Sequence, residues 1–520
     1  MNQARASRYL QGSFNGDVAG VTTSMTSAMT ASRLAQARWA RSPLAQRIGL
    51  VRELRGLIAE NASQLAEASA SARFRPMLES LTAEVLPLAE ACRFLEREAG
   101  KLLKPLRLGK RGLPLWLAGV CSEIQREPFG VVLIIGPGNY PLLLPGVQLI
   151  QALVAGNAVW LKPGVGGTDA ARALCDLIAR AGFDPQLVAL LPESLEAARA
   201  AIAAHPDKVL FTGSAATGEK ILAQLGPHLI PATMELSGCD AVILRADADL
   251  DLAVKALVFG LRLNNGATCM SPRRVFVARS IATELEGRLA HAFSTRGIGG
   301  NKAQPFAQRD QSILTPAAAG KLRPLLDDAL AGGAHFVAGS ILENGSIATP
   351  LVLAGLSPDA RLLHEDVFAP VLALVTVAGD EETLARANDS QFALAASIFT
   401  RDESAGRFLA ARLNVGVVTI NDLIIPTADA RLPFGGRKRS GFGITRGAQG
   451  LLELTTPKVI TVSRSNFRPA FEAPQPGDAR LFQAHLKLSH GRGLKSRWGA
   501  LCSLIRSISG RKHVSRKETT

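Results

Sequence analysis

The sequence predicts an α/β fold, with helices on a doubly wound parallel sheet and a second strand–helix series after it. The first observation is the repeated alternation of short β-branched runs with longer helical segments, which favours parallel strands joined by right-handed crossovers. The second is composition. Aromatic residues make up only 5% of the 520 residues, hydrophobic residues 47% and charged residues 20%. A low aromatic share of this kind suits helices packed on a parallel sheet. A chain of this length is expected to form two or three packed units.

The first half of the chain supplies the elements of one sheet. Leu, Ala and Ile recur at three- and four-residue intervals from about residue 31 to 108, the spacing of a helix face. The β-branched run 131–136 indicates a buried strand, which Pro137, Gly138 and Asn139 end. The alternation continues with predicted helices at 142–153 and 169–181 and predicted strands at 158–161, 187–191 and 208–211.

A second series of alternating strands and helices begins near residue 241 and runs to about residue 423. Its strand candidates are 241–244, 274–277, 371–377 and 415–420. We find no internal repeat in the sequence.

Both ends of the chain differ in composition from the body. Residues 1–30 are rich in Ser, Thr, Ala and Gly, and we expect a flexible leader there. Residues 464–480 contain three prolines and are expected to form a linker. The segment 464–520 has twelve Lys and Arg against three acidic residues, so most of the net charge of +15 lies there. Because the body lacks a stripe of interleaved aromatic and basic residues, the charge does not predict nucleic-acid binding.

Apolar residues near the end of the chain recur at helical spacing within the basic segment. These are Leu494, Trp498, Leu501, Leu504, Ile505 and Ile508, and Lys495, Arg497 and Arg506 occupy other positions. A basic amphipathic helix with a tryptophan suits an anionic membrane surface, which predicts peripheral membrane contact. A helix packed on the body of the protein, or a disordered basic tail, would explain the same pattern.

The cysteines and the N-terminus bear on the cellular compartment. The six cysteines are far apart and form no CxxC pair, so we expect free thiols in a reducing cytoplasm and no metal site. Arg5 and Arg8 have no apolar stretch behind them, which argues against a secretory signal. No run of about 18 apolar residues is present to span a bilayer. The expected location is cytoplasmic, or peripheral at the inner face of a membrane.

One cluster of residues presents a candidate nucleophile. The segment 264–269 places Cys269 in a small, polar, glycine-containing turn just after a helical segment. Such a turn gives the cysteine backbone N–H neighbours and solvent access, which favour a thiolate. A cysteine taken alone is more often a small buried hydrophobe, so this turn does not by itself identify a catalytic residue.

Three further features are candidates for cofactor binding and acid–base chemistry. The run 211–218 ends a strand in Thr-Gly-Ser at a helix start, where free N–H groups suit a phosphate, although an ordinary serine-capped turn looks the same. Glu235 lies between apolar neighbours, and burial would raise its pKa towards that of a general base; a salt-bridged structural glutamate is the alternative. Lys162 ends a strand and either binds a ribose hydroxyl or is a solvated loop lysine.

Taken together, these features resemble the aldehyde dehydrogenase superfamily from roughly residue 35 to 462. The resemblance rests on the segments 127–131, 136–141, 156–159, 162–163, 211–214, 235–238, 266–269, 365–371, 432–436 and 440–443, in this order. So many ordered matches favour the catalytic interpretation of Cys269 over the structural one.

The resemblance implies a role for each candidate. Cys269 would attack an aldehyde to give a thiohemiacetal and then a thioester, which water activated by Glu235 would hydrolyse to the carboxylic acid. The side-chain amide of Asn139 and the backbone N–H of Cys269 would form the oxyanion hole. NAD or NADP would accept the hydride. The residues implied to contact this cofactor are Ile135, Lys162, Phe211, Gly213, Ser214, Leu236, Asp366 and Phe368.

The resemblance also implies a domain organisation. Residues 31–110 and 127–238 would form a Rossmann-like dinucleotide-binding domain, and residues 239–440 a second α/β catalytic domain. A small β-rich oligomerisation element would combine 111–126 with 441–463, in a homodimer or homotetramer. The basic tail 464–520 would follow it.

Several positions depart from the usual pattern of the family. Gly138 replaces a tryptophan and Ala267 a glutamine, and we interpret both as tuning of the walls around substrate or cofactor. Val165 replaces a glutamate that holds the ribose hydroxyls, which removes an anion that would repel a 2′-phosphate and leaves both NAD and NADP open. Asp366 replaces a glutamate and reaches one methylene less far. The usual glycine-rich loop near the adenine is here 192–196.

Two rival functions remain open at this point. An acylating enzyme would pass the thioester to coenzyme A, but it would not need Glu235. A membrane-associated scaffold would keep the fold without turnover, but it would not need Cys269, Glu235 and Asn139 together. The sequence does not predict which aldehyde is the substrate, because pocket-lining loops vary independently of the fold.

Overall fold

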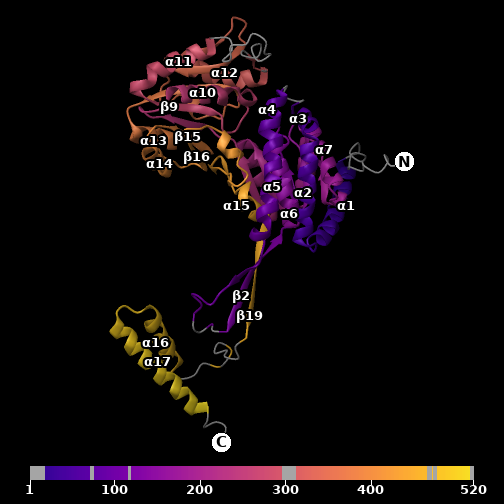
Figure 1. Cartoon of the computed structure of the whole chain (residues 1–520), viewed down its shortest axis with the longest axis vertical. Coiled ribbons are helices and arrows are strands. Elements are labelled where there is room, and N and C mark those ends of the chain that lie inside the picture. The colour runs from indigo at the N-terminus through magenta and orange to yellow at the C-terminus, as the bar shows by residue number, and fades with distance from the viewer. Residues whose placement is uncertain are drawn as a thin grey trace, which may run out of the picture. The chain divides into compact units, whose positions relative to one another are not determined.

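The computed structural model of the chain describes residues 18–70, 75–114, 117, 119–294, 312–314, 316–464, 471, 473 and 477–515 (Figure 1). It divides into two compact units. The first unit combines the chain up to residue 106 with residues 125–458, and the second combines residues 107–124 with the chain from residue 459 onward. Every candidate site residue predicted above belongs to the first unit.

Helices form the start of the first unit. They are α1 (Val18–Trp39), α2 (Leu44–Glu60), α3 (Ala62–Ala70), α4 (Met77–Ser80) and α5 (Leu86–Leu102), with a π-helical turn at Leu81–Val85. The prediction of a flexible leader is wrong for residues 18–30, which belong to α1. Met25 and Met29 lie one helical turn apart and are both buried, so this part of the helix packs into the core. Residues 1–17 lie outside the described part of the chain.

Six strands form the first sheet, in the order β18, β7, β6, β3, β4, β5. All neighbours are parallel except β18, which is antiparallel to β7. The first strand along the chain, β3, lies in the middle of this sheet. The chain winds outward through β4 to β5 and then returns to the other side of β3 with β6. The winding direction therefore reverses between β3 and β6. The strands are β3 (Val131–Ile135), β4 (Ala158–Lys162), β5 (Val188–Leu190), β6 (Lys208–Gly213), β7 (Ala232–Leu236) and β18 (Gly441–Phe442).

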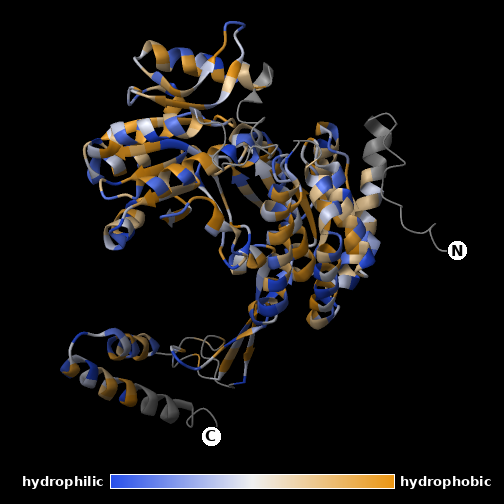
Figure 2. Cartoon of the chain, turned by 45° about the horizontal axis from the view of Figure 1, so that its top comes forward, coloured by the Kyte–Doolittle hydropathy of each residue, from blue (hydrophilic) through white to orange (hydrophobic). Residues whose placement is uncertain are grey.

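Crossover helices cover this sheet. They are α6 (Leu143–Ala155), α7 (Thr168–Arg180), α8 (Leu195–Ala203) and α9 (Ala215–Leu225). Every residue of β3, β4 and α6 is buried, because α6 lies between the sheet and the helices α2 and α5. Figure 2 shows that apolar residues, in orange, recur throughout the helices and strands of the first unit. Burial on all sides explains why these segments are apolar throughout rather than alternating.

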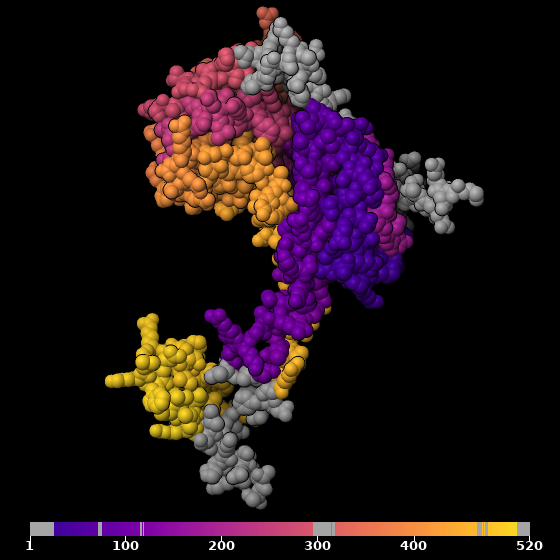
Figure 3. All heavy atoms as spheres, in the orientation of Figure 1, coloured from indigo at the N-terminus to yellow at the C-terminus, as the bar shows by residue number. Residues whose placement is uncertain are grey.

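The second sheet is built from residues 240–420 in the order β10, β12, β13, β9, β8, β15, β16, with β11 paired to β12. Strands β12 to β16 of this path are parallel, and β10 and β11 run antiparallel to β12. Its residues form a mass of their own within the first unit, rose to orange in Figure 3. The strands are β8 (Asp240–Leu244), β9 (Pro272–Ala278), β10 (Ser312–Ile313), β11 (His335–Ile341), β12 (Ile347–Ala354), β13 (Val371–Val377), β15 (Ala395–Phe399) and β16 (Val417–Ile420).

The helices of this second half are α10 (Leu250–Arg262), α11 (Ala282–Ser294), α12 (Pro316–Ala331), α13 (Asp380–Asn388) and α14 (Glu403–Arg412). Two short strands, β14 (Phe392–Ala393) and β17 (Arg437–Lys438), pair with each other. The chain then returns to the first sheet through β18 and the helix α15 (Gly447–Leu452).

A three-stranded sheet contains the residues expected to form an oligomerisation element, with different bounds. Its order is β1 (Leu106–Leu108), β2 (Val120–Pro128) and β19 (Thr455–Ser463). Residues 441–454 do not belong to it, because Gly441 and Phe442 hydrogen-bond to β7 of the first sheet. Beyond β19, the second unit contains the helices α16 (Asp478–His490) and α17 (Leu494–Ser515). Across the described residues, no helix is long and apolar enough to cross a membrane.

Candidate active site

The turn that presents Cys269 is built from residues with unusual backbone geometry. After α10, Asn264 and Asn265 adopt φ of 52° and 51°, and Gly266 adopts φ of 68°. A Cβ on Gly266 would lie 2.5 Å from the Cα of Pro370, so only glycine fits there. Cys269 follows, half-buried, just before β9. The predicted turn after a helix is therefore present, and it is held against the second sheet.

The surroundings of Cys269 differ from the expectation of a thiolate-favouring site. Burial raises the pKa of the Cys269 thiol well above its ordinary value, and the nearby carboxylates of Glu235 and Asp240 raise it further. The Arg446 guanidinium and the backbone N–H of Met270 act in the opposite direction. The expectation was wrong because it counted the N–H groups of the turn but not the apolar side chains and carboxylates that distant segments bring to it.

Glu235 lies at the end of β7 and is buried. Its Oε2 accepts a hydrogen bond of 3.0 Å from the Thr445 hydroxyl. Its Oε1 is also buried, and it has no hydrogen-bond partner among the described residues. Burial raises the pKa of Glu235, whereas Arg446 and the Thr445 hydroxyl lower it. The carboxylate thus has one fixed oxygen and one oxygen left for a further donor.

Asn139 faces the same turn. Its Nδ2 donates a hydrogen bond of 3.0 Å to the carbonyl oxygen of Ala267, two residues before Cys269. Its own carbonyl oxygen accepts hydrogen bonds from Asn264 Nδ2, at 3.0 Å, and from Arg75. Tyr140, the next residue, shares a hydrogen bond of 2.7 Å with the hydroxyl of Thr268. The loop before α6 and the cysteine turn are therefore tied together by side-chain contacts.

Arg75 is a buried charge that sequence reasoning missed. It pairs with Glu84 at 2.5 Å and donates a hydrogen bond of 3.2 Å to Asn264 Oδ1. Glu84 Oε2 in turn accepts the backbone N–H groups of Leu142 and Leu143 at the start of α6, at 2.8 and 3.1 Å. No local motif marks this pair, since both residues lie in the helical N-terminal region. Together they fix the loop that carries Asn139.

Arg446 is a second charge that sequence reasoning missed. It directly precedes α15, with φ of 62°, and its Nη1 donates a hydrogen bond of 2.8 Å to the carbonyl oxygen of Thr427. Its guanidinium lies 4.4 Å from the centroid of the Phe434 ring. Burial lowers the pKa of Arg446, and Glu235 and Cys269 act against that effect. The neighbouring 440–443 motif was noted in the sequence, but nothing in it signals that the residue beyond it faces Cys269.

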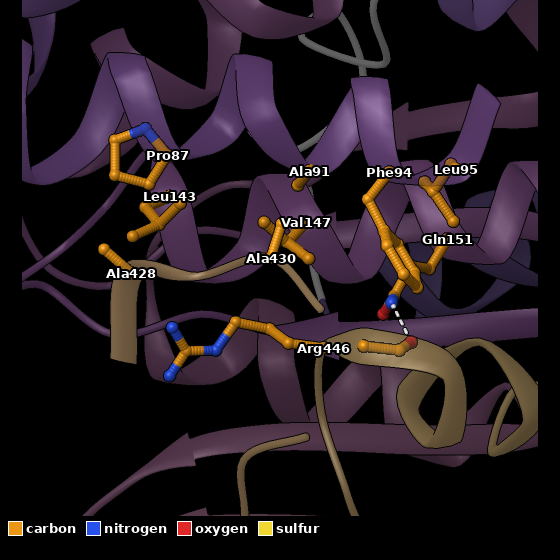
Figure 4. A pocket seen from close by; sticks show the side chains of 11 residues that line it. Pro87, Ala91, Phe94, Leu95, Leu143, Val147, Gln151, Ala428, Ala430 and Arg446 are labelled. Carbon is orange, nitrogen blue, oxygen red and sulfur yellow. Dashed lines mark hydrogen bonds between the residues drawn. The ribbon is translucent and has the colours of Figure 1, made fainter. Parts of the chain in front are cut away.

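A small cavity lies between Arg446 and the helices α5 and α6 (Figure 4); its space of about 310 Å³ includes the open solvent at its mouth, and the enclosed part has room for about one water molecule. Most of its lining is apolar. Gln151 is the polar exception on α6, and its Nε2 donates a hydrogen bond of 3.2 Å to the carbonyl oxygen of Gly447. The lining residues are Pro87, Ala91, Phe94, Leu95, Leu143, Val147, Gln151, Ala428, Ala430, Arg446 and Gly447. Arg446 is thus shared by the cavity wall and the surroundings of Cys269 and Glu235.

Five of the predicted cofactor residues meet at one edge of the first sheet. Ile135, the last residue of β3, pairs in register with Lys162 on one side and with Phe211 on the other. Gly213 pairs with Leu236 at the ends of β6 and β7. Because ligands of such sheets bind where the winding reverses, outside the carboxyl ends of the strands, these residues occupy the expected position for a dinucleotide.

The remaining predicted cofactor residues lie at the ends of other segments. Ser214 is the N-cap of α9, and its hydroxyl accepts the N–H of Thr217 at 3.4 Å. Asp366 and Phe368 come from the segment before β13, in the second half of the chain. Burial raises the pKa of Asp366, with Arg273 opposing it, and its Oδ1 has no partner within the described segments. The Phe368 side chain is exposed.

The two departures Gly138 and Val165 belong to one contact. A Cβ on Gly138 would lie only 2.7 Å from the carbonyl oxygen of Val165, so a side chain at 138 would require the backbone of the next loop to move. A Cβ on Gly164 would likewise lie 2.2 Å from the carbonyl carbon of Pro137. The interpretation of Gly138 as tuning of a wall stays a prediction, and the structure adds a packing reason for the glycine. Glycine is needed because the loops after β3 and β4 touch through their backbones.

Most of the chain is similar to known proteins of one family. The family model described as the aldehyde dehydrogenase family matches residues 15–460. The chain is 31% identical over 438 residues to a 4,4′-diapolycopene aldehyde oxidase from a Methylomonas species, covering 84% of this chain and 81% of the relative. It is 30% identical over 471 residues to a putative NADP⁺ succinate-semialdehyde dehydrogenase of Mycolicibacterium smegmatis, covering 89% and 90%.

A solved structure with the same fold is the NAD⁺ complex of an aldehyde dehydrogenase from Bacillus cereus. Its TM-score with this chain is 0.76 at 28% identity, covering 85% of this chain and 89% of that one. The match of the family model over residues 15–460 includes both sheets and the turns that carry the candidate residues. The chain belongs to the aldehyde dehydrogenase family.

Proposed function

We propose that the protein oxidises an apolar aldehyde to a carboxylic acid, with Cys269 as the nucleophile and NAD⁺ as the hydride acceptor. The observation that carries this proposal is the position of Arg446. This residue lines the apolar cavity and also lies close enough to Cys269 and Glu235 to lower the pKa of both. A thiol and a carboxylate near the same guanidinium suit attack on a carbonyl carbon, followed by attack of water.

In the proposed first half of the reaction, the Cys269 thiol gives its proton to solvent, the resulting thiolate adds to the aldehyde carbon, and the carbonyl oxygen gains negative charge. Two N–H groups would stabilise that charge, the backbone N–H of Cys269 and one from Asn139. An amide nitrogen carries two hydrogens, so the bond from Asn139 Nδ2 to Ala267 leaves the second one to donate. A nicotinamide dinucleotide, when bound, supplies the acceptor for the hydride that leaves the same carbon. A thioester then remains on Cys269.

In the proposed second half, Glu235 takes a proton from the water that hydrolyses the thioester. A water molecule at Glu235 Oε1 would satisfy a buried oxygen that has no partner in the described part of the chain. The Thr445 hydroxyl holds the other oxygen and so fixes the direction of the free one. Burial raises the pKa of Glu235, which makes it a stronger base than an exposed carboxylate. This role favours a carboxylic acid product over transfer to coenzyme A.

The cavity supports an apolar chain on the aldehyde. Its walls along α5 and α6 carry aliphatic and aromatic side chains, and Arg446 is the one charged residue among the described residues that line it. The named relatives include both a 4,4′-diapolycopene aldehyde oxidase and a putative succinate-semialdehyde dehydrogenase. We favour the apolar class, because every described lining residue of the cavity other than Arg446 and Gln151 is apolar.

The test is formation of reduced dinucleotide by the purified full chain with acetaldehyde, hexanal, decanal and succinic semialdehyde. We expect kcat/KM to rise roughly fourfold with each methylene that the cavity can bury. Product analysis with and without coenzyme A should show the free acid in both cases. A preference for succinic semialdehyde would contradict the substrate class, and an absolute requirement for coenzyme A would contradict the role of Glu235.

The edge of the first sheet fits a dinucleotide. Ser214 opens α9, so the first N–H groups of that helix are available to a pyrophosphate. Lys162 ends β4 beside this position, and burial lowers its pKa while the nearby Glu193 raises it. Glu193 Oε2 accepts hydrogen bonds of 2.9 Å from the backbone N–H of Gly166 and from the Thr168 hydroxyl. A carboxylate therefore lies next to Lys162, although Val165 itself supplies none.

We propose that Glu193 takes over the function of the missing glutamate and makes the enzyme prefer NAD⁺ to NADP⁺. A carboxylate beside the ribose hydroxyls accepts hydrogen bonds from NAD⁺ and repels a 2′-phosphate. Glu193→Gln keeps an oxygen for Gly166 but removes the charge. We expect it to raise the ratio of kcat/KM for NADP⁺ over NAD⁺ about tenfold or more.

The matched control for this variant is Glu196→Gln, which removes an equal charge from an exposed position on α8. The control should leave the cofactor ratio unchanged. A wild-type enzyme that prefers NADP⁺, or equal ratios in both variants, would show that Glu193 does not select the cofactor.

We also propose that the chain self-associates through β19. This strand lies at the edge of the three-stranded sheet, and all its residues after Thr455 are exposed, including Val459, Ile460 and Val462. An open apolar edge strand is a template for pairing with another chain. Light scattering on the purified protein should give the mass of two or more chains, and the mass of one chain would contradict the proposal.

A further inference from the structure

The two C-terminal helices form a hairpin whose inner side is packed. Figure 1 shows α16 and α17 side by side, and they contact each other along their length. Ala484 and Ala500 are buried between them, and the Nε of Arg497 donates a hydrogen bond of 2.8 Å to the carbonyl oxygen of Leu488. The small residues let the helices approach closely. The contact between the two helices therefore explains why some residues of the hairpin are apolar.

The hairpin also has apolar residues that this contact does not use. On α17, Leu494 is 85% exposed and Trp498, one turn later, is 69% exposed; Ile505 follows two turns further, at 55%. On α16, Phe482 and Leu486 lie one turn apart and are 48% and 58% exposed. Large side chains in such a row are costly to leave in water, and exposed apolar patches of this kind mark interaction sites.

The charge of the hairpin is strongly one-sided. Arg480, Lys487, Arg492, Lys495 and Arg506 are exposed. Asp478 is the one acidic residue among the described residues from 477 to 506. Basic side chains interspersed with exposed Trp, Leu, Phe and Ile complement a surface that is negatively charged outside and apolar beneath. That combination belongs to a membrane with anionic lipids rather than to another folded protein.

We propose that the hairpin of α16 and α17 docks the protein on anionic lipid membranes. The apolar residues of the two helices enter the boundary between headgroups and acyl chains, and the lysines and arginines contact the lipid phosphates. Docking of this kind needs no spanning segment. It does not depend on the aldehyde chemistry proposed above, but it would keep the protein at a surface in which apolar aldehydes dissolve.

The test is flotation of the full chain with vesicles of phosphatidylcholine, with or without phosphatidylglycerol. We expect the protein to float with the anionic vesicles, to stay behind with the neutral ones, and to be released by high salt. Lys487→Gln/Lys495→Gln/Arg506→Gln should weaken binding roughly a hundredfold, since each basic residue near the surface contributes about fivefold. Trp498→Ser/Ile505→Ser should weaken it at least about tenfold.

Matched controls come from the first unit. Phe408 on α14 is as exposed as the hairpin residues, and Lys104, Lys255 and Arg401 are exposed basic residues. Phe408→Ser and Lys104→Gln/Lys255→Gln/Arg401→Gln should leave binding unchanged. All variants should keep wild-type melting temperatures and wild-type rates with a water-soluble aldehyde, which separates failure of docking from failure of catalysis.

Three results would overturn the proposal. Equal flotation with neutral and anionic vesicles would remove the role of the charges. If the hairpin and control variants lost vesicle binding to the same extent, binding would depend on the net charge of the protein and not on the hairpin. A change in molar mass, but not in vesicle binding, on Trp498→Ser/Ile505→Ser would make a second copy of the chain the partner of the apolar face.

Discussion

Cys269→Ala is expected to lower the rate of aldehyde oxidation at least about 10⁴-fold, because no other group can form the covalent intermediate. The apolar cavity and the dinucleotide edge do not include this side chain, so binding of both ligands should persist. The measurement is reduction of the dinucleotide, together with its binding followed by calorimetry. Loss of turnover with retained binding is the result that assigns the chemistry to the thiol.

The matched control for this prediction is Cys239→Ala. Cys239 is buried, lies three residues after Leu236, and donates only a weak hydrogen bond, 3.6 Å long, to the carbonyl oxygen of Leu363. Removal of this sulfur should change the rate little. A Cys269→Ala enzyme that reduces the dinucleotide at the wild-type rate would mean that oxidation proceeds without a covalent intermediate, and would remove the basis of the proposed mechanism.

Glu235→Gln should leave the first half of the reaction intact and block the second. We expect a burst of one reduced dinucleotide per active site, followed by a steady-state rate lowered by about 10²–10⁴-fold. Glutamine fits the same space and can still accept from Thr445, but it cannot take a proton from water. Rapid-mixing absorbance resolves the burst, and mass spectrometry of the quenched protein should show the acyl group on Cys269.

The pH dependence of the wild-type enzyme follows from the same residue. Only the ionised form of Glu235 accepts a proton, and burial raises its pKa, so hydrolysis of the thioester should accelerate as the pH rises through that raised value. Thr445→Val removes a hydroxyl that lowers this pKa and should shift the profile to higher pH. Glu235→Gln should abolish it. A Glu235→Gln enzyme without any burst would instead make Glu235 the base that takes the proton of the Cys269 thiol.

The strands that could be predicted from the sequence are those whose own residues are as apolar as the buried positions they occupy. The predicted strands at 131–136, 158–161 and 208–211 coincide with β3, β4 and β6, which are buried and rich in β-branched or aliphatic residues. Strand β7 was not predicted, because its five residues include Thr233 and Glu235 and resemble a loop. It forms nonetheless, since β6 and β18 pair with it on either side. Pairing with a segment some two hundred positions away leaves no local signal.

The residues of the candidate site divide in the same way, into those with a local sequence signal and those without one. Cys269, Glu235 and Asn139 could be picked out because each lies in a motif of neighbouring residues. Arg75 and Arg446 could not, because each acts on a turn that is distant in sequence. A lone arginine in a helical or loop segment usually lies in solvent. The raised pKa of Cys269 has the same origin, since burial of the thiol and the nearby carboxylates of Glu235 and Asp240 arise only through the fold.

The position of Arg446 has a consequence for how a catalytic cycle would end. The proposed reaction converts a neutral aldehyde into a carboxylate, so an anion would form beside a guanidinium that is held by Thr427 and Phe434. That cation would attract the product more than the substrate. Departure of the acid would then be the slow event, and added carboxylates of the same chain length would compete with the aldehyde. The enzyme would then be inhibited by its own product as that product accumulates.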